Sequence, residues 1–335
     1  MGSGAARLTR WTVWAFVLAL GVACRGESGV DAGTGDDAGL ASDAGPADAG
    51  AADSGAAPED AGTGEDAGEP APDGGDAGVP SDAGTPADSG VTPDAGTTLR
   101  LPPANGGLDY QLGGAYPPPA GVTVVGRDRN DPPAAGIYNI CYINGFQIQP
   151  DEVDEWTQAR PELMLRDAQG DLVIDPDWDE ILIDVRTPQK RAAVAAVVAG
   201  WIDGCRAAGF DAIEIDNLDT YSRSQGLLTE DDNVAAMRLF ADAAHAAGMA
   251  IGQKNSAELV GRRTELGTDF AVVEECNRYD ECDAFTGAYG DQVYIIEYRR
   301  QDFDTGCAQY PGLSIIFRDV NLTTPGSASY RYSGC

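Results

Sequence analysis

The chain has few of the residues on which many enzymes depend. It contains one histidine, His245, and no Cys-x-x-Cys motif. A Ser-His-Asp or Cys-His mechanism would therefore have to use His245, and a zinc site is improbable. His245 lies shortly before Gly248 at the end of a predicted helix, where a cation is favourable, so we interpret it as structural. The folded part also has no Gly-rich phosphate loop, and we expect no metal and no cofactor.

The N-terminal part lacks another set of residues. Between positions 26 and 98 there is no lysine, arginine or aromatic residue, and the tripeptide Asp-Ala-Gly recurs. Such a segment has almost nothing to bury and repels itself, so residues 25–99 are predicted to be a disordered Asp/Ala/Gly/Pro-rich linker. A calcium-binding repeat is the alternative, but the tract lacks the apolar position that lets such repeats stack.

Residues 1–24 resemble an export signal. Arg7 and Arg10 precede an apolar run over 11–23 that is too short for a comfortable membrane span. The run ends in a sequence similar to a bacterial lipobox, in which Cys24 would be lipidated; ordinary cleavage after Ala23 is the alternative. We expect an exported protein, either an outer-membrane or cell-surface lipoprotein or a secreted one, that touches the membrane only through a lipid anchor.

Residues 100–335 are predicted to form one folded domain with an acidic surface. The first 99 residues hold 17 of the 54 acidic residues and 3 of the 22 basic ones, which leaves 19 basic and 37 acidic residues and a net charge of −18. An acidic surface argues against nucleic acid and anionic membranes as partners and favours cationic or neutral ligands. We expect a monomer.

Six cysteines remain when Cys24 is set aside, an even number in an exported chain, which predicts three disulfides. Their connectivity has 15 possibilities. The local choices are Cys276 with Cys282 and Cys307 with Cys335, which leave Cys141 with Cys205.

Apolar, β-rich runs alternate with helical patterns in the folded part, which predicts a (β/α)8 TIM barrel in the α/β class. One predicted helix begins at Thr187 and ends at Gly209, and a second begins at Thr229 and ends at Gly248. There are nine runs, one more than such a barrel needs, so the start is irregular or one run is an extra strand. The runs cover 109–113, 122–126, 138–143, 181–185, 212–216, 250–254, 270–275, 293–298 and 313–317.

The stretch over 209–219 is the centre of the functional prediction. Alternation places Ile213 and Ile215 on one face of a strand and Glu214 and Asp216 on the other. Polar groups also end several other strands, at the barrel face that carries active sites. Paired carboxylates without metal ligands are what glycoside hydrolysis needs. Aromatic residues beside the strand ends could stack on sugar rings or pack the rim: Tyr142, Phe146, Tyr221, Tyr279 and Tyr298.

Several segments together resemble glycoside hydrolase family 114, whose members are endo-α-1,4-polygalactosaminidases with a TIM-barrel fold. The resemblance extends over about residues 100–335. It is carried by the segments Asp-Tyr-Gln-Leu at 109–112, Tyr-Asn-Ile-Cys-Tyr-Ile at 138–143, Ile-Asp-Val-Arg at 183–186, the stretch over 209–217, Gln-Lys-Asn at 253–255, the Glu-Glu-Cys segment over 274–282 and Ile-Glu-Tyr at 296–298.

The resemblance implies hydrolysis of α-1,4-linked galactosamine polymers, which are polycations near neutral pH. It implies that Asp216 and Glu274 are the catalytic pair of a retaining mechanism, and we assign Asp216 as nucleophile and Glu274 as acid/base. Further matching positions imply substrate binding and support: Tyr142, Asp184, Arg186, Glu214, Asn217, Lys254, Asn255, Glu275 and Glu297.

Two other functions stay open at this point. A surface lipoprotein that binds carbohydrate without cleaving it would keep the barrel but would not need both acids. An α-glycosidase on a related barrel would instead cleave neutral glycans.

Overall fold

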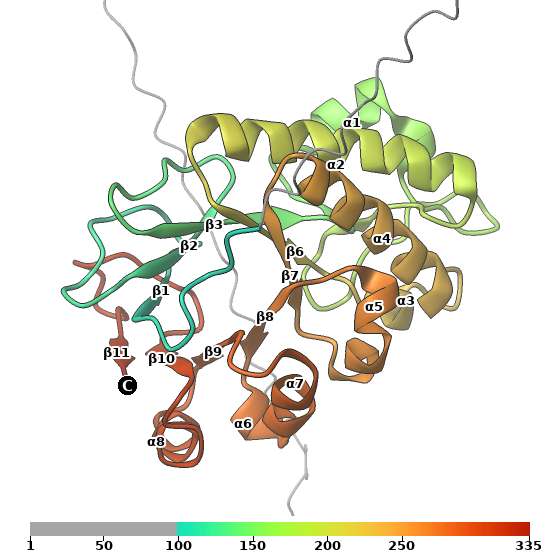
Figure 1. The fold of residues 1–335 in the computed structure, drawn as a ribbon. Coiled ribbons are helices and arrows are strands. Elements are labelled where there is room, and N and C mark those ends of the chain that lie inside the picture. Colours follow the sequence, from blue (N-terminus) through green and yellow to red (C-terminus); the bar gives the residue numbers. More distant parts are fainter. Residues whose placement is uncertain (1–98) are drawn as a thin grey trace, which may run out of the picture. The chain divides into compact units, whose positions relative to one another are not determined.

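The computed structural model describes residues 99–335, and this part contains a barrel of parallel strands with helices along part of its outside (Figure 1). The predicted export signal, Cys24 and nearly all of the predicted linker lie outside the described residues. None of the helices described is long and apolar enough to cross a membrane.

Eight parallel strands form the barrel wall in the order β1-β2-β3-β6-β7-β8-β9-β10, and β11 adds to β10 in the antiparallel direction. β10 comes back beside β1, so the sheet curves round onto itself. The strands of this sheet are β1 (Leu108–Tyr110), β2 (Val124–Asp128), β3 (Tyr138–Asn144), β6 (Ala212–Asp216), β7 (Ala250–Lys254), β8 (Phe270–Glu274), β9 (Val293–Glu297), β10 (Ser314–Arg318) and β11 (Tyr332–Gly334).

One of the nine predicted runs does not belong to the barrel. In the run over 181–185, only β5 (Ile181–Leu182) is a strand, and it pairs antiparallel with β4 (Gln147–Ile148) in a separate small sheet. The run is buried, and its apolar pattern alone cannot distinguish a barrel strand from a strand of a small separate sheet. The prediction of a barrel strand at 181–185 is therefore wrong. This run is the one in excess of the eight strands that the barrel needs. The barrel start is irregular as expected, since no helix separates β1 from β2 or β2 from β3.

Two long helices begin and end where their capping residues predict. α2 (Pro188–Ala208) begins after Thr187, whose side chain accepts a hydrogen bond from the Lys190 backbone, and ends at Gly209 in the left-handed conformation. α4 (Glu230–Ala246) begins with a capping box between Thr229 and Asp232. The remaining helices are α1 (Val153–Ala159), η1 (Pro161–Leu163), α3 (Thr220–Arg223), η2 (Ala257–Arg262), α5 (Arg263–Leu266), α6 (Cys276–Tyr279), α7 (Cys282–Tyr289) and α8 (Arg300–Gln309).

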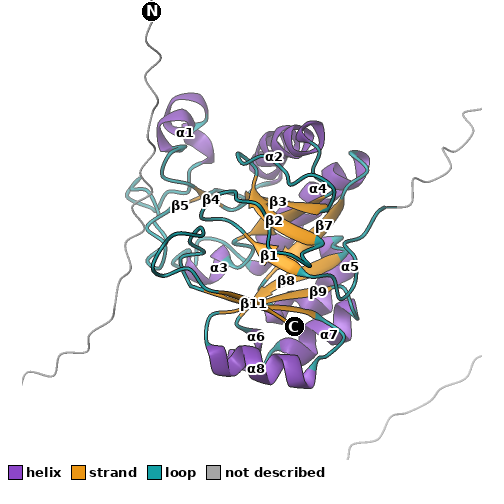
Figure 2. Cartoon of the chain, turned by 90° about the vertical axis from the view of Figure 1, so that its left-hand side faces the viewer, coloured by secondary structure: helices purple, strands orange, loops and turns teal. Residues whose placement is uncertain are grey.

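Each barrel strand has one face toward the interior and one toward the helices, which Figure 2 shows flanking the sheet. On β6, Ile213 and Ile215 pack with apolar residues of α2 and α4, whereas Ala212 belongs to the cluster that fills the barrel interior. Glu214 and Asp216 share the interior face with Ala212, because side chains alternate along a strand. The predicted alternation over 209–219 is confirmed.

Three disulfides fasten the outer elements, with the pairing expected from the sequence. Cys141 of β3 is joined to Cys205 of α2, Cys276 to Cys282 and Cys307 to Cys335. Stable disulfides are typical of proteins that work outside the reducing cytosol.

A fully buried ion pair joins β1 to β10 where the barrel closes. Arg318 Nη1 lies 3.0 Å from Asp109 Oδ1, and both side chains are inaccessible to solvent. The same guanidinium also donates to the backbone carbonyls of Tyr110, Thr323 and Arg331, so each of its three nitrogens has a hydrogen-bond acceptor. Removing one member of such a pair strands the other charge in the interior.

We therefore expect Arg318→Met to lower the free energy of unfolding by about 3–5 kcal/mol. Arg238 and Asp242 form an exposed pair on α4, and Arg238→Met is the matched control, with an expected loss of less than about 1 kcal/mol. Denaturant unfolding with the disulfides intact measures both variants. Equal losses in the two would show that the closing pair does not stabilise the barrel.

Candidate active site

Three charged residues end neighbouring barrel strands on the interior face. Asp216 is the last residue of β6, Lys254 of β7 and Glu274 of β8. The carboxyl ends of parallel strands meet at one face of the barrel, so these side chains converge there. This is where the sequence predicts the active site.

Lys254 lies at the centre of the cluster. Its Nζ is 3.2 Å from Glu274 Oε2, 3.3 Å from Asp216 Oδ2 and 3.6 Å from Glu214 Oε1. The side chains of Lys254 and Glu214 are 2% and 0% exposed, whereas those of Asp216 and Glu274 are 19% and 24% exposed. Burial lowers the pKa of Lys254, but the neighbouring carboxylates raise it more, so its pKa is well above the ordinary value and the ammonium stays protonated.

A tyrosine hydroxyl donates to each of the three carboxylates. Tyr110 Oη lies 2.6 Å from Glu214 Oε1 and Tyr142 Oη lies 2.8 Å from Asp216 Oδ2, while the Tyr298 hydroxyl donates to Glu274 Oε1. Burial, together with the neighbouring carboxylates, raises the pKa of all three tyrosines well above the ordinary value. The tyrosines therefore remain protonated donors.

Two asparagines form hydrogen bonds with the two partly exposed acids, and each of these bonds uses a backbone N–H group. The backbone N–H of Asn217 donates to Asp216 Oδ1 at 2.8 Å, and the backbone N–H of Glu274 donates to Asn255 Oδ1 at 2.8 Å. Both asparagines have positive φ, 65° and 48°, a conformation that asparagine adopts more readily than most residues. Asn255 Nδ2 also lies 3.4 Å from Glu274 Oε2.

A second line of contacts leads from Asn217 to the loop before β5. Asn217 Nδ2 donates to Asn144 Oδ1 at 3.0 Å, and Asn144 Nδ2 donates to Glu180 Oε2 at 2.8 Å. Burial raises the pKa of Glu180 to about 7, against the lowering effect of the Asn144 hydrogen bond. Trp178 precedes Glu180 by two residues and is 67% exposed.

The structure brings together part of the residue set predicted from the sequence. Asp216, Glu274, Glu214, Lys254, Tyr142, Asn217 and Asn255 form one connected group. The sequence assigned no role to Tyr110, Asn144 or Glu180. Asn144 directly follows the predicted strand over 138–143, so the strand-end pattern could have found it, whereas Tyr110 and Glu180 carry no such signal.

Four predicted substrate-binding residues make their contacts elsewhere. Asp184 is buried and pairs with Arg186 Nη2 at 2.7 Å and Lys190 Nζ at 2.5 Å, in a separate hollow beside the start of α2. Burial works against ionisation of Asp184, but these two cations lower its pKa. Glu275 pairs with Arg278, and Glu297 accepts from the Asn277 backbone and side chain. Within residues 99–335, no hydrogen bond or ion pair joins these residues to the Lys254 cluster.

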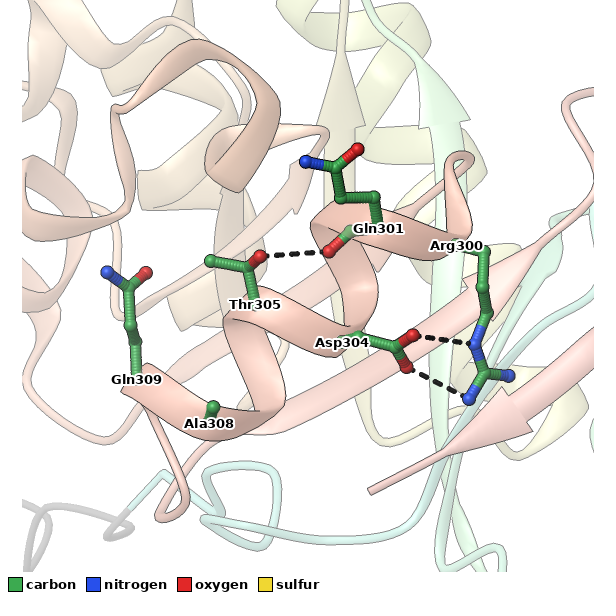
Figure 3. A pocket seen from close by; sticks show the side chains of 6 residues that line it. All are labelled: Arg300, Gln301, Asp304, Thr305, Ala308 and Gln309. Carbon is green, nitrogen blue, oxygen red and sulfur yellow. Dashed lines mark hydrogen bonds and ion pairs between the residues drawn. The ribbon is translucent and has the colours of Figure 1, made fainter.

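Two further features lie away from Asp216 and Glu274: His245, and a surface hollow beside α8. His245 Nε2 contacts Asp269 Oδ2 at 2.9 Å, just before β8 begins and thus at the opposite end of the strands, which agrees with a structural role. The hollow of Figure 3 lies along one side of α8 between Arg300 and Gln309. Its Arg300–Asp304 ion pair is a surface contact between exposed groups.

A family model for glycoside-hydrolase family GH114 matches residues 89–334. The chain belongs to glycoside hydrolase family GH114. This member is therefore a glycoside hydrolase, and the resemblance seen in its motifs is confirmed. No curated protein matches the chain.

Several solved structures are similar to this GH114 protein, and the first of those named here shares its fold. The structure of Aspergillus fumigatus Ega3 in complex with galactosamine is 23% identical, covers 71% of this chain and 98% of its own, and has a TM-score of 0.56. The glycoside hydrolase domain of PelA from Pseudomonas aeruginosa is 15% identical, with 66% and 98% coverage and a TM-score of 0.46. An α-galactosidase from Thermus thermophilus is 14% identical, with 68% and 60% coverage and a TM-score of 0.41.

Glu214 gives this GH114 domain a specific dependence of stability on pH. Burial raises the pKa of Glu214 from 4.5 to about 7, although Lys254 and Tyr110 act to lower it. A carboxyl with a raised pKa holds its proton in the folded state after the unfolded chain has released it. Its contribution to stability therefore falls as the pH rises from 4.5 to about 7 and is constant above that window.

We expect Glu214→Gln to remove this slope. The free energy of unfolding of the native protein, relative to that of the variant, should fall between pH 4.5 and pH 7. Urea unfolding of both proteins across this range measures the difference. Parallel pH curves would show that Glu214 titrates alike in the folded and unfolded states.

Proposed function

We propose that this chain hydrolyses an exopolysaccharide containing α-1,4-linked galactosamine, by a retaining mechanism in which Asp216 is the nucleophile and Glu274 the acid/base. The observation that carries the proposal is the pair of partly exposed carboxylates at the carboxyl ends of β6 and β8, both in contact with Lys254. Of the three acids in the cluster, Asp216 and Glu274 are the two that a substrate can reach, since Glu214 is fully buried.

The separation of the two acids supports a retaining outcome. Asp216 Oδ2 and Glu274 Oε2 are at most 6.5 Å apart, the sum of their 3.3 and 3.2 Å distances to Lys254 Nζ. Retaining enzymes hold their carboxyl groups about 5–5.5 Å apart, whereas inverting enzymes leave about 6.5–9.5 Å for a water molecule. The upper bound for this pair of oxygens is compatible with the retaining range.

The surroundings of the two acids support their separate roles. Both oxygens of Asp216 accept hydrogen bonds, from the Asn217 backbone amide and the Tyr142 hydroxyl, which hold the carboxylate in one orientation for attack. Glu274 is the more exposed of the two, as an acid/base that exchanges protons with a leaving oxygen and with water must be.

The reaction then has two balanced steps. An Asp216 oxygen attacks the anomeric carbon while Glu274 gives its proton to the departing glycosidic oxygen, which leaves a glycosyl ester and an ionised Glu274. In the second step Glu274 takes a proton from water as the water oxygen attacks the anomeric carbon. Asp216 is released as a carboxylate, and the product keeps the anomeric configuration of the substrate.

An amino-sugar polymer fits the charge of this domain. Galactosamine units without acetyl groups are cationic near neutral pH, and the domain carries a net charge of −18 by the residue counts above. The galactosamine bound in the Ega3 structure is of the same sugar class. A neutral glycan would gain nothing from this field.

We also propose the domain organisation predicted from the sequence, with residues 1–24 as an export signal, residues 25–99 as a linker and residues 100–335 as the hydrolase. The three disulfides support a place outside the cytosol. Fatty-acid labelling that is present in the native chain and retained in Cys24→Ser would contradict lipidation at Cys24.

The central experiment is digestion of deacetylated and fully acetylated α-1,4-galactosaminan, followed by mass spectrometry. We expect cleavage of the deacetylated polymer, a loss of about 10²–10⁴-fold in kcat for Glu274→Gln, and background rates for Asp216→Asn. Asp242→Asn on the outer face of α4 is the matched control and should retain the native rate. Full activity in both site variants would refute the assignment, and polymer binding without new reducing ends would indicate a non-catalytic protein.

Azide addition distinguishes the two roles. With Glu274→Ala, azide should replace water at the glycosyl ester and give a glycosyl azide of retained configuration. With Asp216→Ala, azide should attack the substrate directly and give the inverted anomer. The opposite assignment of products, read by nuclear magnetic resonance, would exchange the roles of the two acids.

Two exposed aromatic residues are placed to stack on the polymer. Tyr279 follows β8 and is 57% exposed, and Trp178 is 67% exposed on the loop that Glu180 joins to Asn144. Among the aromatics predicted for stacking, Phe146 is instead fully buried. We expect Trp178→Ala and Tyr279→Ala to raise KM for long oligomers by about 5-fold or more, with kcat on the shortest cleaved oligomer unchanged, since truncating a Trp or Tyr that anchors a ligand costs about 1 kcal/mol or more. Unchanged KM for long oligomers would exclude both residues from the binding path.

A further inference from the structure

Lys254 is too deeply buried to be an ordinary substrate ligand. Its side chain is 2% exposed, and its ammonium is surrounded by Asp216, Glu274 and Glu214. The Tyr110 hydroxyl lies 3.3 Å from Nζ, and the ring of Tyr142 lies with its centroid 5.7 Å away. The resemblance assigned Lys254 and Glu214 to substrate binding and support, and their burial favours support.

The position of Lys254 matches the movement of charge in a two-carboxylate reaction. Before the first step, Asp216 carries a negative charge and Glu274 carries a proton. After it, Asp216 is a neutral ester and Glu274 is ionised, so one negative charge has moved from one residue to the other. Lys254 Nζ lies 3.3 Å from the first acid and 3.2 Å from the second, and can therefore balance the charge in both states without moving.

Glu214 and Tyr110 contact the Lys254 ammonium from the buried interior of the barrel. Glu214 Oε1 lies 3.6 Å from Lys254 Nζ and accepts the Tyr110 hydroxyl at 2.6 Å. Tyr110 is itself fixed, because its backbone carbonyl accepts a hydrogen bond from buried Arg318. The Tyr110 ring also lies over Gly126, where a Cβ atom would approach Cδ2 of the ring to 2.7 Å. Only glycine at this position leaves room for the ring.

We propose that Lys254 is a positioning residue that serves as the shared counter-ion of Asp216 and Glu274 through both steps of the reaction, held in place by Glu214 and Tyr110. This inference rests on the proposed two-carboxylate function. The titratable groups that face the ammonium are Tyr110 of β1, Tyr142 of β3, Glu214 and Asp216 of β6 and Glu274 of β8, with the Tyr298 hydroxyl on the far side of Glu274.

The test is the pH profile of Lys254→Met, with kcat and KM measured separately on a deacetylated galactosamine oligomer. The ammonium lies 3.3 Å from an oxygen of Asp216 and 3.2 Å from one of Glu274, so its loss should move both limbs of the profile to higher pH, by about 1–3 units. The maximal kcat should fall by about 10²–10³-fold, as when a group that stabilises developing charge is removed. KM should stay within about twofold of the native value, because Lys254 does not reach the substrate.

The opposite pattern overturns the proposal. A substrate ligand would show a raised KM with both limbs of the pH profile in place. Arg238→Met on the exposed face of α4 is the matched loss of one positive charge, and it should move neither limb. If Lys254→Met and Arg238→Met give the same profile, the effect comes from net charge and not from the cluster.

Two further variants keep the test decisive if Lys254→Met does not fold. Lys254→Met with Glu214→Gln removes one charge of each sign from the interior, and should keep part of the upward displacement of both limbs. Glu214→Gln alone retains the ammonium and removes a negative neighbour of Glu274, so its alkaline limb should move to lower pH with KM unchanged. Native profiles in these variants would overturn the inference. Failure of the proposed function is separate, since it would appear as full activity in Asp216→Asn and Glu274→Gln.

Discussion

The buried ion pair between Asp109 and Arg318 is the constraint on which the active face depends. It joins the first and last parallel strands, and the same guanidinium holds the backbone carbonyl of Tyr110. The hydroxyl of Tyr110 reaches Glu214, 104 residues later in the chain, and lies beside Lys254. Closure of the barrel thus fixes Tyr110, and through it the buried end of the charge cluster at Glu214 and Lys254.

Beyond this buried end, the barrel solves the problem of holding three carboxylates together. Like charges this close would raise one another's pKa and favour protonation. One ammonium contacts all three acids, and a tyrosine hydroxyl donates to each. The innermost carboxyl still has a pKa of about 7, because its burial outweighs these contacts. The outer two keep the partial exposure that chemistry on a polymer requires.

Local patterns predicted much of this arrangement, and long-range contacts account for what they missed. The alternation over 212–216 placed Glu214 and Asp216 on one face, and the capping residues Thr187 and Thr229 located the two long helices. The run over 181–185 has the composition of a barrel strand, but its first two residues pair antiparallel with β4 in a separate small sheet, which composition does not specify. For the same reason Asp184 was predicted at the active face and instead pairs with Arg186 and Lys190. The role of Tyr110 depends on barrel closure, which no local pattern encodes.

The acidity of the domain and the single buried lysine therefore have separate roles. In the proposed reaction the carboxylates at the surface attract a cationic polymer, while the two acids of the site pass one negative charge from Asp216 to Glu274. As the proposed counter-ion, Lys254 is buried and lies at nearly equal distance from the acid that starts ionised and the one that becomes ionised. A counter-ion exposed to solvent would be screened and would compete with the amines of the substrate for the same carboxylates. Burial of the lysine avoids both the screening and the competition, which accounts for a cation enclosed among the three carboxylates of the cluster.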